Sequence, residues 1–359
     1  MKWREFAQTL TITILAIVVS LLLFSVFAPL YLLTLGKPPV GPVTLLSEIF
    51  VNGFGSVSQW QDTLSKAAPL ILTALCTALP ARIGLIVIGA EGALALGALA
   101  AAVTGVAMAD ASPFAAECGM AAAGMMVGGL LILSVGGLRY FRGVNETISS
   151  LLIAYIAIAV FNYMVEGPLR DPSALNKPST YPISEDFMIS SMFGYDIHWG
   201  LAFGVIFCFL SWILLYHTTF GFASSMVGGN VRAAQAAGLP VGRLFLITTF
   251  LAGAAAGLAG MVEVAANEGK ANATLLAGYG FKGILVSFIA RHNPLAIIPV
   301  AIMFGGLGAA SGPIQRHIHL PESAVNVLTG ILFIVILSME TLYGRFKVFQ
   351  ARELREVAA

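Results

Sequence analysis

The sequence predicts an all-α, polytopic membrane protein with about ten transmembrane helices and both termini in the cytoplasm. Of its 359 residues, 58% are hydrophobic and only 10% are charged, whereas a soluble domain carries roughly 25% charged residues. Apolar windows of about 20 residues recur along the chain, and a helix of this length spans a bilayer. Helices are the expected form because lipid offers backbone groups no hydrogen-bond partner.

Ten apolar windows are candidate spans. The first is too long for the apolar region of a secretory signal, so we expect it to be a retained anchor. The second, eighth and ninth windows are short or interrupted by glycine, so eight spans are the alternative. The expected spans are approximately 9–30, 67–82, 84–107, 115–138, 147–165, 198–216, 244–264, 276–290, 295–310 and 323–342.

The distribution of Lys and Arg predicts the orientation. Short cytoplasmic loops carry an excess of these residues. With the N-terminus inside, twelve of them fall on the cytoplasmic side and six on the other, and Lys282 lies near the end of a span. The twelve are Lys2, Arg4, Arg82, Arg139, Arg142, Arg232, Arg243, Arg291, Arg345, Lys347, Arg352 and Arg355; the six are Lys37, Lys66, Arg170, Lys177, Lys270 and Arg316.

Three parts follow from these spans. Residues 1–66 form an N-terminal anchor span and an external segment, in which TLLSEIFVNGF (44–54) predicts a short amphipathic helix at the membrane interface. Residues 67–342 form the core, and residues 343–359 a cytoplasmic tail. The long loop at 167–196 is rich in Pro and Ser, and it is either a contact site for an external partner or a connector.

Glycine pairs spaced four residues apart predict close helix packing. They are Gly124 and Gly128, Gly253 and Gly257, and Gly308 and Gly312. This spacing lets helix backbones approach closely in lipid.

The polar stretch SSMVGGNVRAAQAAGLPVGR (224–243) separates two apolar spans on the cytoplasmic side. Asn230 is a favourable N-cap, the alanines favour helix, and Gly238 followed by Pro240 ends it. We expect a helix of about eight to ten residues, roughly 12–15 Å long. Its small side chains would let it enter a groove on another protein. An ordinary surface loop is the alternative.

At these residues the chain resembles the permease subunits of ABC importers, in the branch for simple sugars and nucleosides. Ala233-Ala234-x-x-x-Gly238 is similar to the loop that couples such permeases to their ATPase. Further similar motifs follow in order over about 67–342. They are IGAEGALALGA (88–98), GVNETISSLLIAYIA (143–157), GPLRDP (167–172), LAGAAAGLAGMVEV (251–264) and GYGFKGILVSFIARHNPLAIIPVAIMFGGLGA (278–309).

The resemblance implies partners and a coupling site. ABC ATPase subunits, a second permease subunit (a heterodimer by analogy) and an external solute-binding protein are implied, in a bacterial inner membrane. ATP and Mg would be bound by the partner ATPase, with no cofactor in this chain. The implied coupling residues are Asn230, Arg232, Ala233, Ala234 and Gly238.

The chain departs from the family pattern at several positions, and those other than Arg232, whose departure is common in this branch, leave the solute open. Arg232 stands where many permeases have Glu. Val87-Ile88 replaces the usual Phe-Asn, with Ala93 in place of a Gln. Lys282 stands where an acidic residue is frequent.

Polar and aromatic residues within the spans are candidates for the substrate path. Glu91 would face the solute where IGAEG interrupts the helix, or it would hold a neighbouring helix by hydrogen bonds. Lys282 would line the path or extend toward the interface. Tyr155 and Phe281 would stack on a base or sugar, or would simply pack. Asn145 should cap its helix, with Glu146 at the helix's positive end.

Other chemistry has little support in the sequence. No phosphate-binding loop and no hydrolase motif is present, so we expect a transport subunit rather than an enzyme. Scattered cysteines and the pair His317 and His319 predict no metal site. A net charge of +1 gives no basic face for nucleic acid.

The sequence therefore predicts the permease subunit of an ATP-driven importer for nucleosides or simple sugars. A branched-chain amino-acid permease is the alternative within the family. An ion-coupled secondary transporter is the alternative outside it, and would need embedded acids, of which Glu91 is the persuasive candidate.

Overall fold

The structure is a computed structural model that describes residues 2–34, 36, 40–174, 177–192 and 194–345. Two compact units are present: residues 1–59 with 306–359, and residues 60–305. The predicted tail, 343–359, lies outside the described residues from 346 onward.

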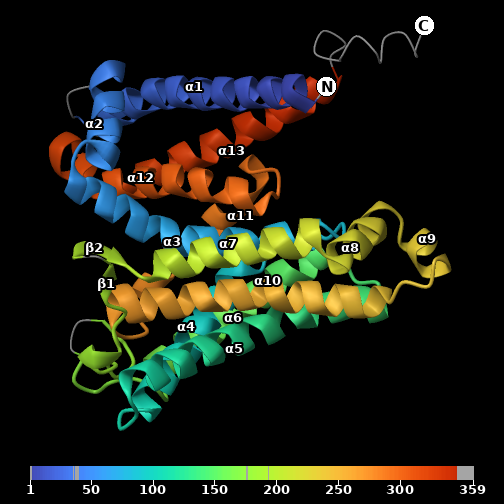
Figure 1. The fold of residues 1–359 in the computed structure, drawn as a ribbon. Coiled ribbons are helices and arrows are strands. Elements are labelled where there is room, and N and C mark those ends of the chain that lie inside the picture. Colours follow the sequence, from blue (N-terminus) through green and yellow to red (C-terminus); the bar gives the residue numbers. More distant parts are fainter. Residues whose placement is uncertain (1, 35, 37–39, 175–176, 193, 346–359) are drawn as a thin grey trace, which may run out of the picture. The chain divides into compact units, whose positions relative to one another are not determined.

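The first unit contains α1 (Lys2–Thr34), α2 (Pro42–Phe54), α13 (Glu322–Arg345) and the last part of α12 (Pro294–Ile318). Helices α1 and α13 pack against one another (Figure 1). A helix is present at the predicted amphipathic segment, as α2, with Leu45 and Ile49 buried and the apolar Phe50 and Val51 exposed. Its position at the membrane interface stays a prediction. One end of α2 approaches α12 closely, because a Cβ on Gly53 would lie 3.0 Å from the carbonyl oxygen of Gly306.

The second unit holds the remaining helices and a short hairpin. Its elements are α3 (Val57–Ala81), α4 (Ala90–Ala107), α5 (Pro113–Arg142), α6 (Glu146–Glu166), η1 (Glu185–Phe187), β1 (Ser191–Met192), β2 (Tyr195–His198), α7 (Gly200–His217), α8 (Thr219–Gly229), α9 (Val231–Ala236), α10 (Val241–Glu263), η2 (Val264–Glu268), η3 (Ala273–Leu275) and α11 (Tyr279–Ile289), followed by α12.

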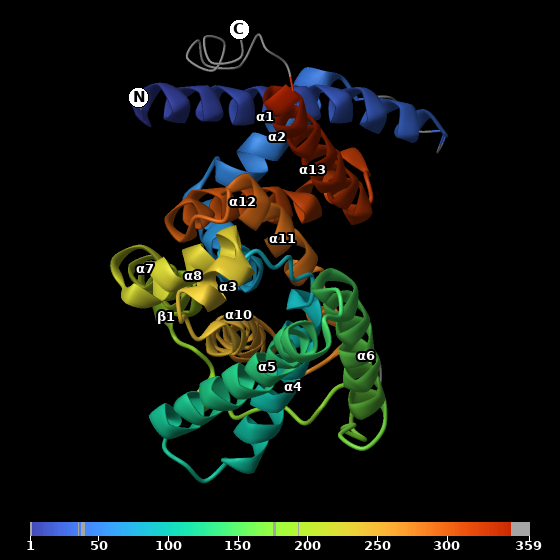
Figure 2. The same ribbon diagram turned by 90° about the vertical axis from the view of Figure 1, so that its right-hand side faces the viewer.

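Helix α10 forms the centre of this unit, beside α4 and α5 (Figure 2). Two of the predicted glycine pairs make this packing close. A Cβ on Gly97 would lie 2.5 Å from Gly257 Cα, and a Cβ on Gly128 would lie 2.5 Å from Gly253 O. In the third pair, a Cβ on Gly312 would meet no described atom within 4 Å.

Seven of the described helices are long and apolar enough to cross a membrane: α3, α4, α5, α6, α7, α10 with η2, and α12. Shorter apolar stretches lie at Val18–Leu33, Val43–Phe54, Ala273–Ile289 and Ser323–Ile336. The predicted span 276–290 corresponds to α11, whose 11 residues are about 16 Å long and too short to cross alone.

Several predicted boundaries differ from the structure, and the largest difference is that α3 begins at Val57 and not at residue 67. The third span was expected from residue 84, but α4 begins at Ala90. Gly84 has a left-handed backbone (φ +79°), and residues 85–88 after it are not helical. The ninth was expected to end at residue 310, but α12 continues to Ile318.

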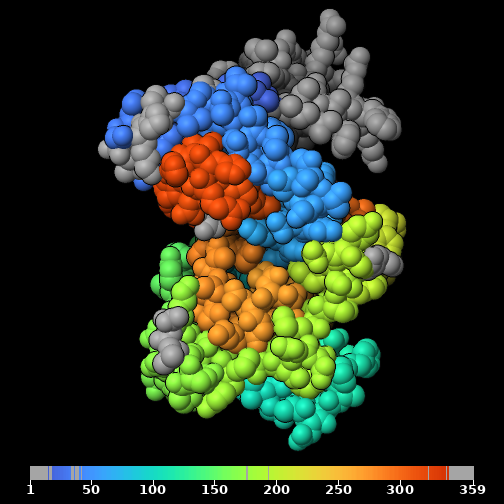
Figure 3. All heavy atoms as spheres, turned by 90° about the vertical axis from the view of Figure 1, so that its left-hand side faces the viewer, coloured from blue at the N-terminus to red at the C-terminus, as the bar shows by residue number. Residues whose placement is uncertain are grey.

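The long loop at 167–196 is fastened to the chain that follows α10. The amides of Thr180, Ile183 and Ile189 donate to the carbonyls of Ala271, Gly269 and Ala265 at 2.8–2.9 Å. Figure 3 shows this loop in yellow-green against the light orange residues. The antiparallel pair β1–β2 closes the loop and leads into α7.

Candidate functional site

The polar stretch at 224–243 folds as the end of α8, the short helix α9 and a tight turn. The Asn230 side chain accepts the amide of Ala233 at 3.1 Å, so the predicted N-cap is present. Gly238 adopts φ +76°, and the amide of Leu239 returns to the carbonyl of Ala234 at 3.1 Å. The helix is shorter than predicted, at six residues (Val231–Ala236), because this turn closes it early.

Most of the predicted coupling residues point away from the unit. Asn230, Arg232, Ala233 and Gly238 are exposed, whereas Ala234 is fully buried. Ala234 belongs to a hydrophobic cluster with the side chains of Leu85, Val227, Val241 and others. It therefore seats α9 on its own unit and leaves the opposite face of α9 open to another molecule.

A cavity of about 470 Å³ lies beside α9. It is bounded by aromatic side chains from the end of α5 and by the turn between α9 and α10. Figure 1 shows α8 and α9 at the end of the unit where α10 begins. The lining residues are Tyr140, Phe141, Gln235, Gly238, Leu239, Pro240, Val241, Gly242, Arg243 and Leu246.

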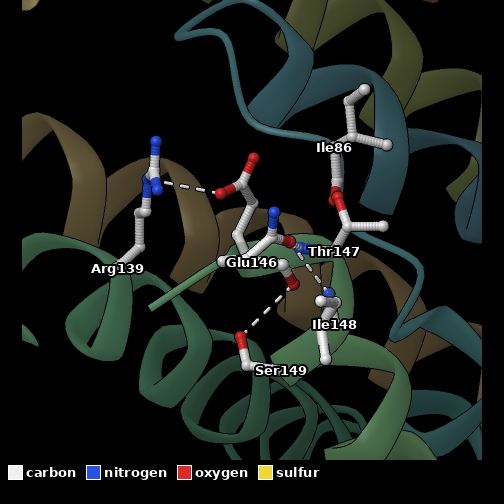
Figure 4. Close-up of polar contacts among 7 residues, drawn as sticks. Ile86, Arg139, Glu146, Thr147, Ile148 and Ser149 are labelled. Carbon is white, nitrogen blue, oxygen red and sulfur yellow. Dashed lines mark hydrogen bonds and ion pairs between the residues drawn. The ribbon is translucent and has the colours of Figure 1, made fainter. Parts of the chain in front are cut away.

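The turn between α5 and α6 has an ordered polar network (Figure 4). The predicted cap is present, since Asn145 Oδ1 accepts the amides of Thr147 and Ile148 at 3.0 and 3.1 Å. Glu146 lies in the first turn and pairs with Arg139 at 3.2 Å. An acid at this position also favours the positive end of the helix.

Two hydroxyls of α6 bind the non-helical chain that precedes α4. Thr147 Oγ1 donates to the carbonyl of Ile86 at 3.0 Å, as Figure 4 shows. The amide of Ile88 donates to Ser150 Oγ, also at 3.0 Å. The motif GVNETISSLL is visible in the sequence, but these hydrogen bonds of Thr147 and Ser150 could not be predicted from it, because their backbone partners lie about sixty residues away.

Glu91 holds the amino end of α11. Its two carboxylate oxygens accept the amides of Gly278 and Gly280, at 3.0 and 2.5 Å. The side chain is 2% exposed. IGAEG does not interrupt a helix as predicted, because α4 begins within it, at Ala90, after a non-helical stretch. The Glu91 carboxylate instead acts as a cap supplied by another element, since the first amides of a helix have no partner within it.

Of the three other candidates for the substrate path, two lie beside Glu91 and the third lies on α6. Phe281 and Lys282 are in the first turn of α11, where Lys282 Nζ donates to the carbonyl of Ala277 at 3.3 Å. Tyr155 is 57% exposed on α6, on a face shared with Leu152 and Ile156. Contact of these residues with a solute stays a prediction.

The structure adds a buried acid that was not among the predicted site residues. Glu263 ends α10, is 5% exposed, and accepts from the side chain of Asn267 at 3.2 Å. The chain then continues as a π-helix, a form often found at functional sites. In the sequence, the only sign of this buried acid is a Glu within the apolar motif LAGAAAGLAGMVEV.

Metal-binding geometry is absent from the described part of the chain, where no three His, Cys, Asp or Glu residues cluster. His317 instead contacts Glu48 at 3.2 Å within the first unit.

Comparison with known proteins identifies the family. The profile described as "branched-chain amino acid transport system / permease component" matches residues 60–337, most of the chain. This chain belongs to that family of transport permeases. Together with its apolar helices, membership makes it a multi-pass membrane protein.

Several relatives of this permease have names that state a solute, including the following three. A glucose ABC transporter permease of Haloferax volcanii is 28% identical, over 86% of this chain and 83% of its own length. A guanosine ABC transporter permease of Bacillus subtilis is 30% identical, over 80% and 83%. A nucleoside ABC transporter permease of Lactococcus lactis is 25% identical, over 87% and 89%.

Proposed function

We propose that this permease is the transmembrane subunit of an ATP-driven ABC importer for nucleosides or simple sugars, acting in a bacterial inner membrane. The observation that carries this proposal is the α8–α9 segment. It presents a short capped helix, seated on its own unit through Ala234, with exposed residues on its other side. Such a helix is suited to enter a groove on a partner.

The energy would come from partner subunits. ABC ATPases, holding ATP and Mg, would dock on α9 and on the cavity of about 470 Å³ beside it. Solute would arrive from an external binding protein, and a second permease subunit would complete the path. ATP binding would move α9 and shift the helices between outward-open and inward-open arrangements.

The solute class rests on chemistry and on relatives. Nucleosides and sugars are polar and uncharged, and the buried acids described in the second unit are few. A fixed charge at membrane depth is costly, so a path with few charges suits a neutral solute. The three relatives are named as permeases for glucose, guanosine and nucleosides, which favours this class over leucine.

A second candidate, an ion-coupled transporter, is favoured by one observation. Glu91 and Glu263 are two buried acids within apolar helices. Glu91 is engaged by two backbone amides, however, which assigns it a structural task. An ion-coupled carrier would also leave the exposed face of α9 without a purpose.

Uptake into proteoliposomes tests the solute class. The permease, its ATPase, its partner permease and a matched binding protein are reconstituted, and labelled guanosine, glucose and leucine are compared. We expect guanosine or glucose to accumulate and leucine to be ignored. Accumulation of leucine, with no competition from nucleosides, would assign the protein to the amino-acid branch.

Cysteine labelling tests the proposed topology. In a cysteine-free background, Lys177→Cys in the long loop should react from outside and Gln235→Cys in α9 only from inside. Reaction of both from one side would refute cytoplasmic termini and the placement of α9 beside the ATPase.

A further inference from the structure

The eight residues between α3 and α4, Arg82–Gly89, form a segment that we call the connector. It contains no regular helix after a final turn at Gly84, yet Leu85 and Val87 are buried. Its middle is fixed to α3, because Thr77 Oγ1 donates to the carbonyl of Val87 at 3.1 Å. The connector is therefore an ordered, non-helical strip inside the unit.

One end of the connector meets α8, backbone to backbone. A Cβ on Gly228 would lie 3.4 Å from the amide nitrogen of Gly84 and closer still to the carbonyl oxygen of Arg82. The Arg82 guanidinium lies 4.9 Å from the centre of the Tyr216 ring on α7. Because backbone atoms meet here, a shift of α8 cannot be absorbed by a side-chain rotamer change.

The other end of the connector is held by α6 and runs into Glu91. Thr147 and Ser150 bind the backbone at Ile86 and Ile88, each at 3.0 Å. Three residues later, the Glu91 carboxylate receives the first amides of α11. An unbroken series of contacts thus runs from Gly228, through the connector, to the amino end of α11.

We infer that the connector transmits movement of the α8–α9 segment to the amino end of α11, with Thr147 and Ser150 as its positioning residues. The inference rests on the proposed function, since it supposes that a partner moves α8 and α9. Coupling between distant sites needs packed elements that shift as units, and close backbone contacts with short hydrogen bonds provide them. Phe281 and Lys282 would then change position when α9 is displaced.

The test removes the hydroxyl groups of Thr147 and Ser150 and changes the shape of the two side chains as little as possible. The double variant Thr147→Val with Ser150→Ala frees the connector from α6. Ser149→Ala is the matched control, because among the described residues the Ser149 hydroxyl donates to Glu146 O within its own helix, at 3.3 Å. Hydrogen exchange of the peptide covering residues 278–282 is measured on the full-length permease in nanodiscs, alone and with ATPase held in its ATP-bound form.

We expect exchange at Gly278 and Gly280 to be roughly tenfold faster in the double variant, equivalent to about 1.4 kcal/mol of local opening, and unchanged in the control. Binding of the ATPase should alter this exchange in the wild type and in Ser149→Ala, but not in the double variant. In proteoliposomes, solute imported per ATP hydrolysed should fall at least about fivefold in the double variant only.

Wild-type exchange at residues 278–282 in the double variant would overturn the inference, whatever the solute. An equal response to ATPase in all three proteins would also overturn it. Failure of the wild-type permease to bind any ATPase would instead refute the proposed function, while the comparison without ATPase would still test the connector.

Discussion

Replacing Gly257 by alanine should destabilise the second unit, because its helices meet there with no room for a methyl group. A Cβ at this position would lie 2.8 Å from the Gly124 carbonyl carbon and 3.2 Å from Gly128 Cα. Both neighbours are backbone atoms, so α5 and α10 must separate to admit it. Overpacking of this kind costs about 1–3 kcal/mol.

Alanine also contributes a gain, since it favours helix by about 1 kcal/mol over glycine. The matched control is Gly137→Ala on α5, where the nearest atoms to a new Cβ are the Leu246 and Phe141 side chains at 3.9 Å. The control substitution should leave the free energy of unfolding unchanged or raise it. Gly257→Ala should lower the free energy of unfolding by up to about 2 kcal/mol, after the helix-propensity gain is subtracted from the overpacking cost.

Thermal unfolding of the purified permease, followed by circular dichroism, measures the difference. A change of 1 kcal/mol corresponds to roughly 2 °C for a unit of about 250 residues, the length of the second unit. Gly257→Ala should therefore unfold several degrees below Gly137→Ala. Equal midpoints for the two variants would refute the claim that close glycine packing joins α5 to α10.

Three further predictions concern α11, the loop before α7, and α9. Glu91→Ala leaves two α11 amides without an acceptor, so the free energy of unfolding should fall by about 1–3 kcal/mol, measured by denaturant titration; an unchanged value would contradict the capping role. Burial lowers the pKa of His198, and a hydrogen bond with the Ser65 backbone opposes this shift in part. As the pH falls, His198 is therefore protonated in the unfolded chain before it is protonated in the folded one, so stability should be highest above about pH 6.5 and decline toward pH 5.5. His198→Gln should flatten that decline. Ala234→Arg should unseat α9 and expose it to limited proteolysis, whereas Ala233→Arg should leave the fold intact and abolish stimulation of the ATPase; equal protease resistance of the two would contradict the assigned faces.

Local features of this permease were predictable from sequence, and long-range ones were not. Asn230, Asn145 and Gly238 act within a few residues of themselves, so capping rules placed them correctly. The partners of Glu91 lie 187 and 189 positions away, and no local pattern names them. A hydroxyl that binds a distant carbonyl, such as that of Thr147, is equally invisible.

Apolar windows predicted where helices occur better than where they begin or end. The window from residue 84 contains a buried but non-helical segment. Leu85 and Val87 are apolar because they pack inside the unit, and not because they belong to a helix. Likewise, Glu263 was overlooked because an acid at the end of an apolar run resembles a span boundary. Burial, and not sequence position, distinguishes it.

The central claim is that an ATPase bound to α9 drives transport. Solute uptake in the presence of ionophores tests it most directly. Proteoliposomes holding the complete complex are loaded with ATP on the ATPase side, and ionophores remove every ion gradient. The account predicts full uptake of labelled guanosine or glucose with ATP and none without it. Uptake that persists without ATP and collapses with the ionophores would contradict the account.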